Sequence, residues 1–90
     1  MNAAENKTAV EKVEADLYAA ALEARMVISG DRRVSEKDAA KLLGYAPGSL
    51  KNTRQEGRAP SHYTRGVGGG RISYRLSDIA ESIEKSRRVT

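Results

Sequence analysis

The 90-residue chain contains no cysteine, phenylalanine or tryptophan, and its four aromatic residues are all tyrosines. Without cysteine, it has neither a disulfide framework nor a thiolate metal site. A chain of this length forms one domain with a modest core. Because four tyrosines add little to that core, we expect marginal stability unless a partner adds buried area.

Long apolar runs are also missing, and no stretch has the hydrophobic region of a signal peptide. Neither a membrane span nor export is therefore expected. The sequence predicts a cytoplasmic protein with no membrane partner.

Groups suited to catalysis are scarce. Histidine occurs once, as His62, among basic residues and glycines, whereas a nucleophile needs a base and an orienting acid. The glycine-rich residues 66–70 lack the Lys-Ser/Thr ending and the strand-to-helix context of a phosphate-binding P-loop. We expect no enzyme activity, metal, cofactor or small-molecule ligand.

Positive charge is abundant but unevenly distributed, with a net charge of +4 for the whole chain. Residues 1–31 carry three basic and six acidic side chains, a net charge of −3, whereas residues 32–90 carry 13 basic and six acidic ones, a net charge of +7. A basic domain gains affinity for DNA by releasing the counterions condensed on it. The second part is therefore the candidate for DNA binding.

Within that basic part, residues 34–60 are typical of two short helices joined by a tight turn. Ser35 can accept a hydrogen bond from an early backbone N–H, and Asp38 places an acid in the first turn, so a helix is predicted to begin near residue 35. Gly44 favours the end of that helix and a three-residue connection. This is the layout of a helix-turn-helix that reads DNA.

The second helix is predicted from Pro47 to Glu56. Proline is tolerated in the first turn, where its missing N–H has no helical partner. Leu50 is the main apolar residue of this helix, and most of its other side chains are polar. Such side chains suit base edges and phosphates.

Residues 61–75 alternate in a way that indicates a β-hairpin, with strands at 61–65 and 71–75 around the glycine-rich loop. We expect Arg65, Arg71 and Arg75 to face outward. A basic hairpin that follows a recognition helix is a wing.

A last helix is predicted after the hairpin, with Ser77 as its N-cap. Ile79, Ala80 and Ile83 fall at helical spacing. The helix is expected to fray into the basic tail of residues 85–88, which is either a solvated end or a phosphate contact.

These pieces, in this order and spacing, resemble the excisionase-type, MerR-like winged helix-turn-helix proteins of bacteria, phages and plasmids. The resemblance covers about residues 33–84. It is carried by AAKLLGY at 39–45, PGSL at 47–50, EGRAP at 56–60, GGRISYR at 69–75 and SDI at 77–79. One position departs: the family usually has Trp or Leu three residues after the Leu50 position, where this chain has Thr53. The departure predicts a less firmly anchored second helix.

The resemblance implies a mainly α-helical domain with a small β-hairpin, whose second helix enters the major groove of double-stranded DNA while the wing touches backbone or minor groove. The expected contacts from the second helix are Ser49, Lys51, Asn52, Thr53, Arg54 and Gln55. The expected contacts from the wing and its flanks are Arg58, His62, Thr64, Arg65, Arg71 and Arg75. We expect the helix to read bases and the wing to bind largely independently of sequence.

The acidic residues 1–31 are expected to form a long helix, from about residue 4 to 28, ahead of the winged helix-turn-helix of residues 32–90. Its apolar stripe consists of Val10, Val13, Leu17, Ala20, Ala24 and Val27. Either this stripe packs on its own domain or it pairs two copies into a homodimer. A parallel pairing is disfavoured because it would bring Glu14, Asp16 and Glu23 of both chains together.

The sequence as a whole predicts a sequence-specific DNA-binding protein that acts as a transcriptional regulator or a recombination directionality factor. It would assemble as a homodimer through the N-terminal helix or cooperatively on DNA, and would be associated with the bacterial nucleoid when bound. One alternative is an architectural or packaging role, like that of winged domains in some phage terminase small subunits. The other is a protein-binding module that reuses the fold.

Overall fold

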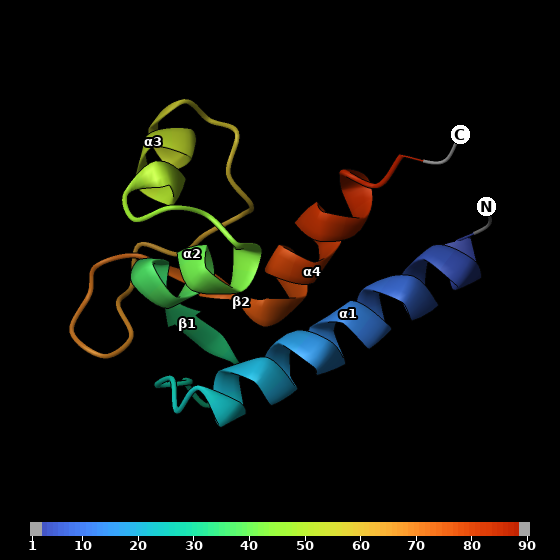
Figure 1. Ribbon diagram of the computed structural model, residues 1–90, viewed down its shortest axis with the longest axis horizontal. Helices are drawn as coiled ribbons and strands as arrows, with labels where there is room; N and C mark the ends of the chain where they lie inside the picture. Colours follow the sequence, from blue (N-terminus) through green and yellow to red (C-terminus); the bar gives the residue numbers. More distant parts are fainter. Residues whose placement is uncertain (1–2, 89–90) are drawn as a thin grey trace.

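The computed structural model describes residues 3–88, with side chains from residue 8 onward, and these residues form four helices and one two-stranded sheet (Figure 1). In chain order the elements are α1 (Ala3–Glu23), β1 (Arg33–Ser35), α2 (Glu36–Leu43), α3 (Ser49–Gln55), β2 (Ser73–Arg75) and α4 (Leu76–Lys85). Residues 1–2 of the expected N-terminal part (1–31) and residues 89–90 of the expected winged helix-turn-helix (32–90) lie outside the described residues. The expected mainly helical class is confirmed.

The sheet joins a different pair of segments from the expected hairpin. β1 and β2 run antiparallel, with Val34 opposite Tyr74. Residues 61–65 contribute only a single bridge, between Tyr63 and Ser73. The expected hairpin is therefore wrong: the strand that pairs with β2 is β1, which buries Val34 and Tyr74, and residues 61–65 meet the other edge of β2 only at Ser73.

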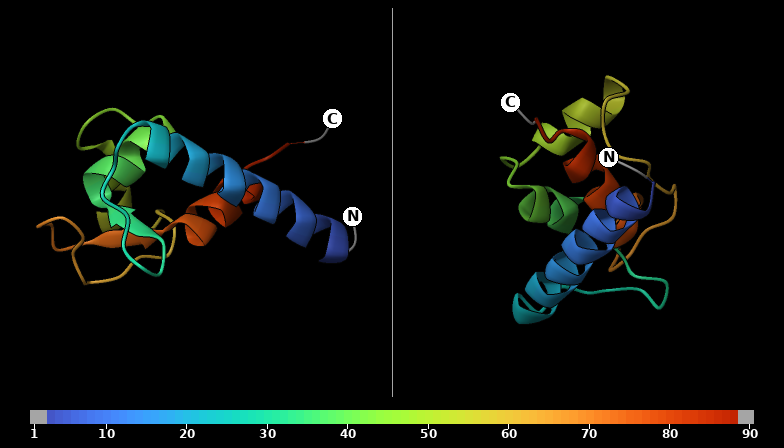
Figure 2. Two further views of the ribbon diagram at one scale, coloured as in Figure 1. Left: turned by 90° about the horizontal axis from the view of Figure 1, so that it is seen from below. Right: turned by 90° about the vertical axis from the view of Figure 1, so that its right-hand side faces the viewer.

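The core lies between the sheet and the helices α1, α2 and α4. Its buried side chains are Leu17, Val34, Ala39, Ala40, Leu50, Tyr74, Leu76, Ile79 and Ala80. α1 and α4 lie side by side and run in opposite directions, so the start of α1 and the end of α4 are at the same end of the molecule (Figures 1 and 2).

α1 ends at Glu23 and not near residue 28. Arg25 adopts the left-handed conformation, with φ of 57°. The N–H groups of Arg25 and Met26 bond to the carbonyls of Leu22 and Ala21, which is the hydrogen-bond pattern of a Schellman cap, where glycine usually stands. Arginine gives no sequence signal for such a cap, so the helix predicted from the apolar pattern alone extends past the observed end of α1.

The apolar stripe of α1 packs on its own chain. Leu17 is in the core, and Val10 and Val13 pack against it. The remaining members of the expected assembly stripe are exposed: Ala20, Ala24 and Val27. These three lie outside the core of the chain, because the helix turns Ala20 away from it and ends before Ala24 and Val27, and Ala21 is buried in their place. Their expected part in pairing two copies stays a prediction.

The expected boundaries of α2 are confirmed. The hydroxyl of Ser35 accepts a hydrogen bond of 3.1 Å from the N–H of Asp38 at the start of the helix. Gly44 ends it with φ of 78°, a left-handed conformation that glycine adopts without steric cost.

Two other helices begin at residues different from those expected. α3 begins at Ser49 and not at Pro47, because Gly48 has φ of 85° and cannot belong to the helix. α4 begins at Leu76, with Arg75 and not Ser77 as its N-cap. Since β2 ends at Arg75, the chain passes directly from strand to helix there.

Candidate nucleic-acid interface

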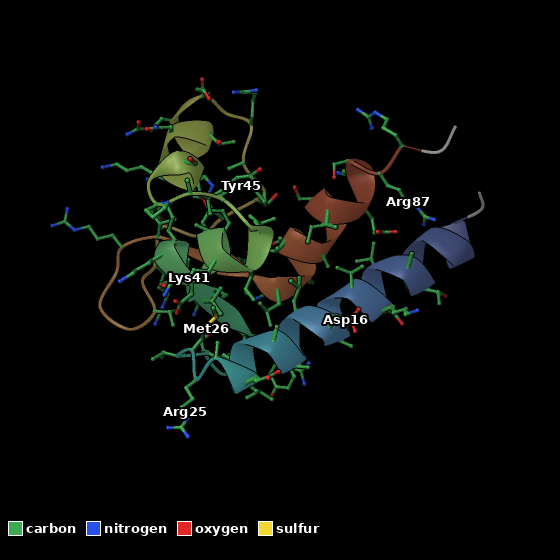
Figure 3. The ribbon with its side chains drawn as sticks, viewed as in Figure 1. Asp16, Arg25, Met26, Lys41, Tyr45 and Arg87 are labelled. Atoms are coloured by element: carbon green, nitrogen blue, oxygen red, sulfur yellow. The ribbon has the colours of Figure 1, made fainter. Side chains whose placement is uncertain are left out.

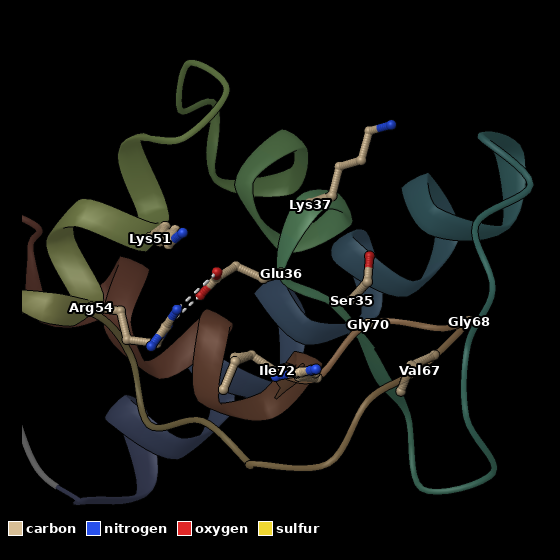
Figure 4. Close-up of a pocket in the computed structure, with 10 residues that line it drawn as sticks. Ser35, Glu36, Lys37, Lys51, Arg54, Val67, Gly68, Gly70 and Ile72 are labelled. Carbon is tan, nitrogen blue, oxygen red and sulfur yellow. Dashed lines mark hydrogen bonds and ion pairs between the residues drawn. The ribbon is translucent and has the colours of Figure 1, made fainter.

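α3 is held against the molecule by Leu50 and by an ion pair to α2. The Leu50 side chain is 1% exposed. The guanidinium of Arg54 contacts both carboxylate oxygens of Glu36, with Nε 2.6 Å from Oε2 and Nη2 3.3 Å from Oε1 (Figure 4). The bidentate geometry of such a pair fixes orientation as well as distance.

A third residue, Tyr74 on β2, joins this ion pair. Its hydroxyl donates a hydrogen bond of 2.9 Å to Oε2 of Glu36, and its side chain is fully buried. Burial raises the pKa of Glu36, but the hydrogen bonds from Arg54 and Tyr74 outweigh this and leave the pKa below its ordinary value. Burial and then the bond to Glu36 raise the pKa of Tyr74, so the phenol stays a donor.

The loop that connects α3 to β2 folds back on itself. At Gly66 any side chain would collide with the carbonyl of Gly70, and Val67 is buried with 7% exposure. We call residues 64–72 the glycine loop; it extends from the sheet on the same side of the molecule as α2 and α3 (Figure 1). The close backbone approach and the buried valine give this loop a defined shape.

The base of the glycine loop is held by a partly buried network of polar side chains. Arg33 donates hydrogen bonds to Ser73 (2.9 Å) and to Asp31 (2.8 Å). The Ser73 hydroxyl donates to the carbonyl of Arg65. Hydrogen bonds from Arg33 and then Ser29 hold the pKa of Asp31 well below its usual range.

Arg75 was expected to face outward from the wing, but it is half-buried. It forms an ion pair of 3.2 Å with Asp31, and its guanidinium lies 5.2 Å from the ring centre of Tyr63. The pairing of β2 with β1 brings Arg75 to Asp31, and no alternating pattern within residues 61–75 contains that information.

Two adjoining hollows lie on the face made by α2, α3 and the glycine loop. The loop-side hollow is lined by Ser35, Glu36, Lys37, Lys51, Arg54, Val67, Gly68, Gly70, Arg71 and Ile72 (Figure 4). The turn-side hollow is lined by Glu36, Lys37, Ala40, Lys41, Tyr45, Pro47, Gly48, Leu50 and Lys51. They share Glu36, Lys37 and Lys51, and so form one continuous surface.

This surface is positively charged because its cations, Arg54 excepted, have no carboxylate partner among the side chains that the structure describes. Within residues 8–88, ion pairs engage Arg33, Arg54, Arg58, Arg75, Lys85 and Arg87. Lys37, Lys41, Lys51 and Arg71 make none among the described side chains. Four uncompensated cations on one face give a local positive potential that attracts phosphate.

The acidic residues of α1 lie elsewhere on the molecule. Asp16, labelled on α1 in Figure 3, is on the other side of the molecule from Tyr45 in the turn-side hollow. None of the described residues of α1 lines either of the two adjoining hollows.

Some of the other expected contact residues of α3 are exposed, and one is hydrogen-bonded within the helix. Asn52 and Gln55 are exposed, as is Lys51. Thr53 is half-buried and its hydroxyl donates a 2.8 Å hydrogen bond to the carbonyl of Ser49, one turn earlier in the helix. Thr53 therefore does not anchor α3, and the bidentate Glu36–Arg54 ion pair does so.

The residues expected to contact DNA from the wing and its flanks do not gather at one place on the surface. Arg58 is exposed and paired with Glu56 at 2.7 Å, and it lines neither of the two hollows. His62 is exposed, with its ring centre 5.8 Å from that of Tyr74. Thr64 and Arg65 are exposed on the glycine loop.

Sequence reasoning missed Lys37, Lys41 and the anchoring role of Glu36. The two lysines are four residues apart in a helix that begins at Glu36, a spacing that places side chains on one face. That spacing was a usable signal. Nothing in the local pattern signals the partner of Glu36, because Arg54 lies on another helix.

The described residues contain no group of three or more His, Cys, Asp or Glu side chains placed to hold a metal ion. None of the described helices has the length and apolar character required to cross a bilayer. Comparison with models of protein families, with curated proteins and with solved structures gave no match.

Proposed function

We propose that this chain is a sequence-specific double-stranded DNA-binding protein of the winged helix-turn-helix type, acting as a transcriptional regulator or a recombination directionality factor. In this proposal α3 enters the major groove and the glycine loop is the wing on the backbone or minor groove. The observation that supports it most is the grouping of the unpaired cations Lys37, Lys41, Lys51 and Arg71 around the two adjoining hollows.

The proposal assigns different tasks to the side chains of this face. Asn52, Gln55 and Lys51 are exposed on α3 and suit base edges, asparagine and glutamine pairing with adenine and lysine with guanine. Lys37, on α2, and Arg71, on the glycine loop, both line the loop-side hollow. A phosphate of the DNA backbone between them would fix the register of α3 without itself reading sequence.

The first prediction concerns this phosphate contact. Lys37→Gln and Arg71→Gln should each weaken duplex binding and lower the magnitude of the salt slope by about 0.9 for every phosphate that is no longer neutralised. The measurement is fluorescence anisotropy titration of labelled duplex DNA at several salt concentrations.

The matched control is Lys12→Gln, which removes the same charge from an exposed position on α1. It should leave the slope unchanged, since α1 lies away from the proposed interface. If Lys12→Gln and Arg71→Gln lower the slope equally, the effect is one of net charge and the proposed interface is wrong. Absence of duplex binding by the wild-type protein even at low salt would contradict the whole proposal.

A second candidate function, a protein-binding module, is favoured by one observation. The floor of the turn-side hollow is apolar, with Ala40, Leu50 and the 41%-exposed Tyr45. An apolar floor with a lysine rim suits an acidic amphipathic segment of another protein. The titration with labelled duplex DNA separates the two candidates, because a DNA-binding protein binds the duplex and a protein-binding module does not.

A further inference from the structure

α3 has few attachments that could set its orientation. It is seven residues long, Leu50 is its one buried residue, and its N-cap Gly48 provides no side-chain hydrogen bond. So short a helix has little stability of its own. One buried side chain and the short connection to α2 hold it close to the molecule, and the contact of Arg54 with Glu36 adds the side-chain link between α3 and α2 that constrains which side chains face outward.

We infer that Glu36 is a positioning residue that fixes the rotation of α3 through Arg54, and that Arg54 is thereby withheld from direct contact with DNA. The consequence for DNA recognition rests on the function proposed above. Both side chains of the pair are 20% exposed, and the shorter N–O distance is 2.6 Å. At that exposure the pair is shielded from most of the water that weakens surface ion pairs.

Tyr74 makes this contact rigid. Glu36 is the first residue of α2, and its Oε2 accepts hydrogen bonds from both Arg54 and Tyr74. Because Tyr74 is fully buried within the sheet, the carboxylate is held between two elements that cannot move independently. α3 is thus aligned with both α2 and β2.

The sign of the charge distinguishes positioning from simple electrostatics. Glu36 lines the same hollow as Lys37, Lys51 and Arg71, where a carboxylate repels phosphate. If Glu36 had no positioning role, neutralising it would strengthen DNA binding and would also release Arg54 as an additional cation. Positioning predicts the opposite for the preferred DNA site, because the base-reading side chains of α3 would lose their alignment.

The test uses Glu36→Gln, which keeps the shape of the side chain and removes its charge. The preferred duplex, selected from a randomised pool with the wild-type protein, is titrated beside a random duplex at two salt concentrations. Glu36→Gln should bind the preferred duplex about tenfold more weakly or worse, with no loss on the random duplex and no smaller salt slope. Equal or tighter binding to the preferred duplex would overturn the inference.

Further variants address folding and geometry. Arg54→Lys keeps the charge and loses the bidentate geometry. It should therefore reduce the ratio of the affinity for the preferred duplex to that for the random duplex, with an unchanged salt slope. If circular dichroism shows that Glu36→Gln is unfolded, the same measurements are made on Arg54→Lys instead. The charge swap Glu36→Arg with Arg54→Glu should recover part of the ratio, and an Arg54→Lys protein with a wild-type ratio would overturn the inference.

A measurement without DNA separates this inference from the proposed function. Hydrogen exchange and amide chemical shifts of residues 49–55 should change in Glu36→Gln, while those of α1 stay as in the wild type. If the wild-type protein binds no duplex but the α3 amides respond in this way, the positioning role stands and the DNA-binding proposal fails. Unchanged α3 amides would overturn the positioning role whatever the DNA result.

Discussion

Arg33, Arg54 and Arg75 each contact a carboxylate, either Asp31 or Glu36, whereas Arg71 contacts none among the described side chains. All four residues have the same chemistry, so residue type alone does not tell which of them can meet a ligand. A charge that is already paired gains less from a phosphate, because the first partner must be displaced or shared. At the scale of single residues, the carboxylates decide which cations remain available.

A prediction at this scale compares two serines. Ser35→Ala should lower the free energy of unfolding by about 1 kcal/mol, because the Ser35 hydroxyl caps α2. Ser77→Ala should change it by less than about 0.5 kcal/mol, since Ser77 lies inside the first turn of α4, where the N-cap is Arg75. Urea denaturation followed by circular dichroism gives both values, and equal losses would show that the capping assignment is wrong.

At the scale of elements, α1 is part of the same core as the basic portion of the chain. Leu17 is buried with Ile79 and Ala80 of α4, and Val10 and Val13 pack at its side. The helix would expose these apolar side chains to water if it separated from α4. We therefore regard α1 as a structural support for the elements that carry the candidate interface.

Two leucines on α1 give the corresponding prediction. Leu17→Ala should cost about 2 to 5 kcal/mol of unfolding free energy, because a buried side chain is removed and a cavity is left. Leu22→Ala on the same helix is the control: Leu17 is 7% exposed and Leu22 is 54% exposed, so the loss at Leu22 should be small. The two are measured by denaturation under identical conditions. Similar costs would mean that Leu22 is covered in solution, as it would be in an assembly.

At the scale of the whole molecule, charge and shape are polarised together. α1 runs along one side beside α4, while α3 lies on the other side of the core (Figure 1). The two adjoining hollows lie on the basic side. A molecule arranged in this way would present one face to an anionic partner and keep its acidic helix turned away.

The oligomeric state is the prediction for this scale. Because Val10, Val13 and Leu17 are used within the chain, little of the apolar stripe is left to pair two copies. We expect a monomer of 9.8 kDa at tens of micromolar in sedimentation equilibrium without DNA. A mass that rises with concentration toward twice this value would contradict the expectation and would direct attention to the exposed Leu22 and Val27.

Several features of this protein are determined by the sequence alone, because they depend on neighbours a few residues away. The N-cap at Ser35 and the C-cap at Gly44 are local hydrogen-bond and backbone effects. The burial of Ile79 and Ala80 follows from helical spacing. The division into an acidic and a basic part is a property of composition.

Only the tertiary structure decided the features that depend on residues far apart in the chain. The pairing of β1 with β2, in place of the expected hairpin, comes from burying Val34 against Tyr74. The Schellman cap at Arg25 is local, but with arginine in the place of glycine the sequence carries no signal for it, and only the structure shows where α1 ends. Arg54, the partner of Glu36, and Arg75, the second partner of Asp31, lie far along the chain from those carboxylates, and an ion pair forms only where folding brings opposite charges within a few ångströms. Local pattern cannot encode such distances, so the fold alone decides which cations stay free to bind.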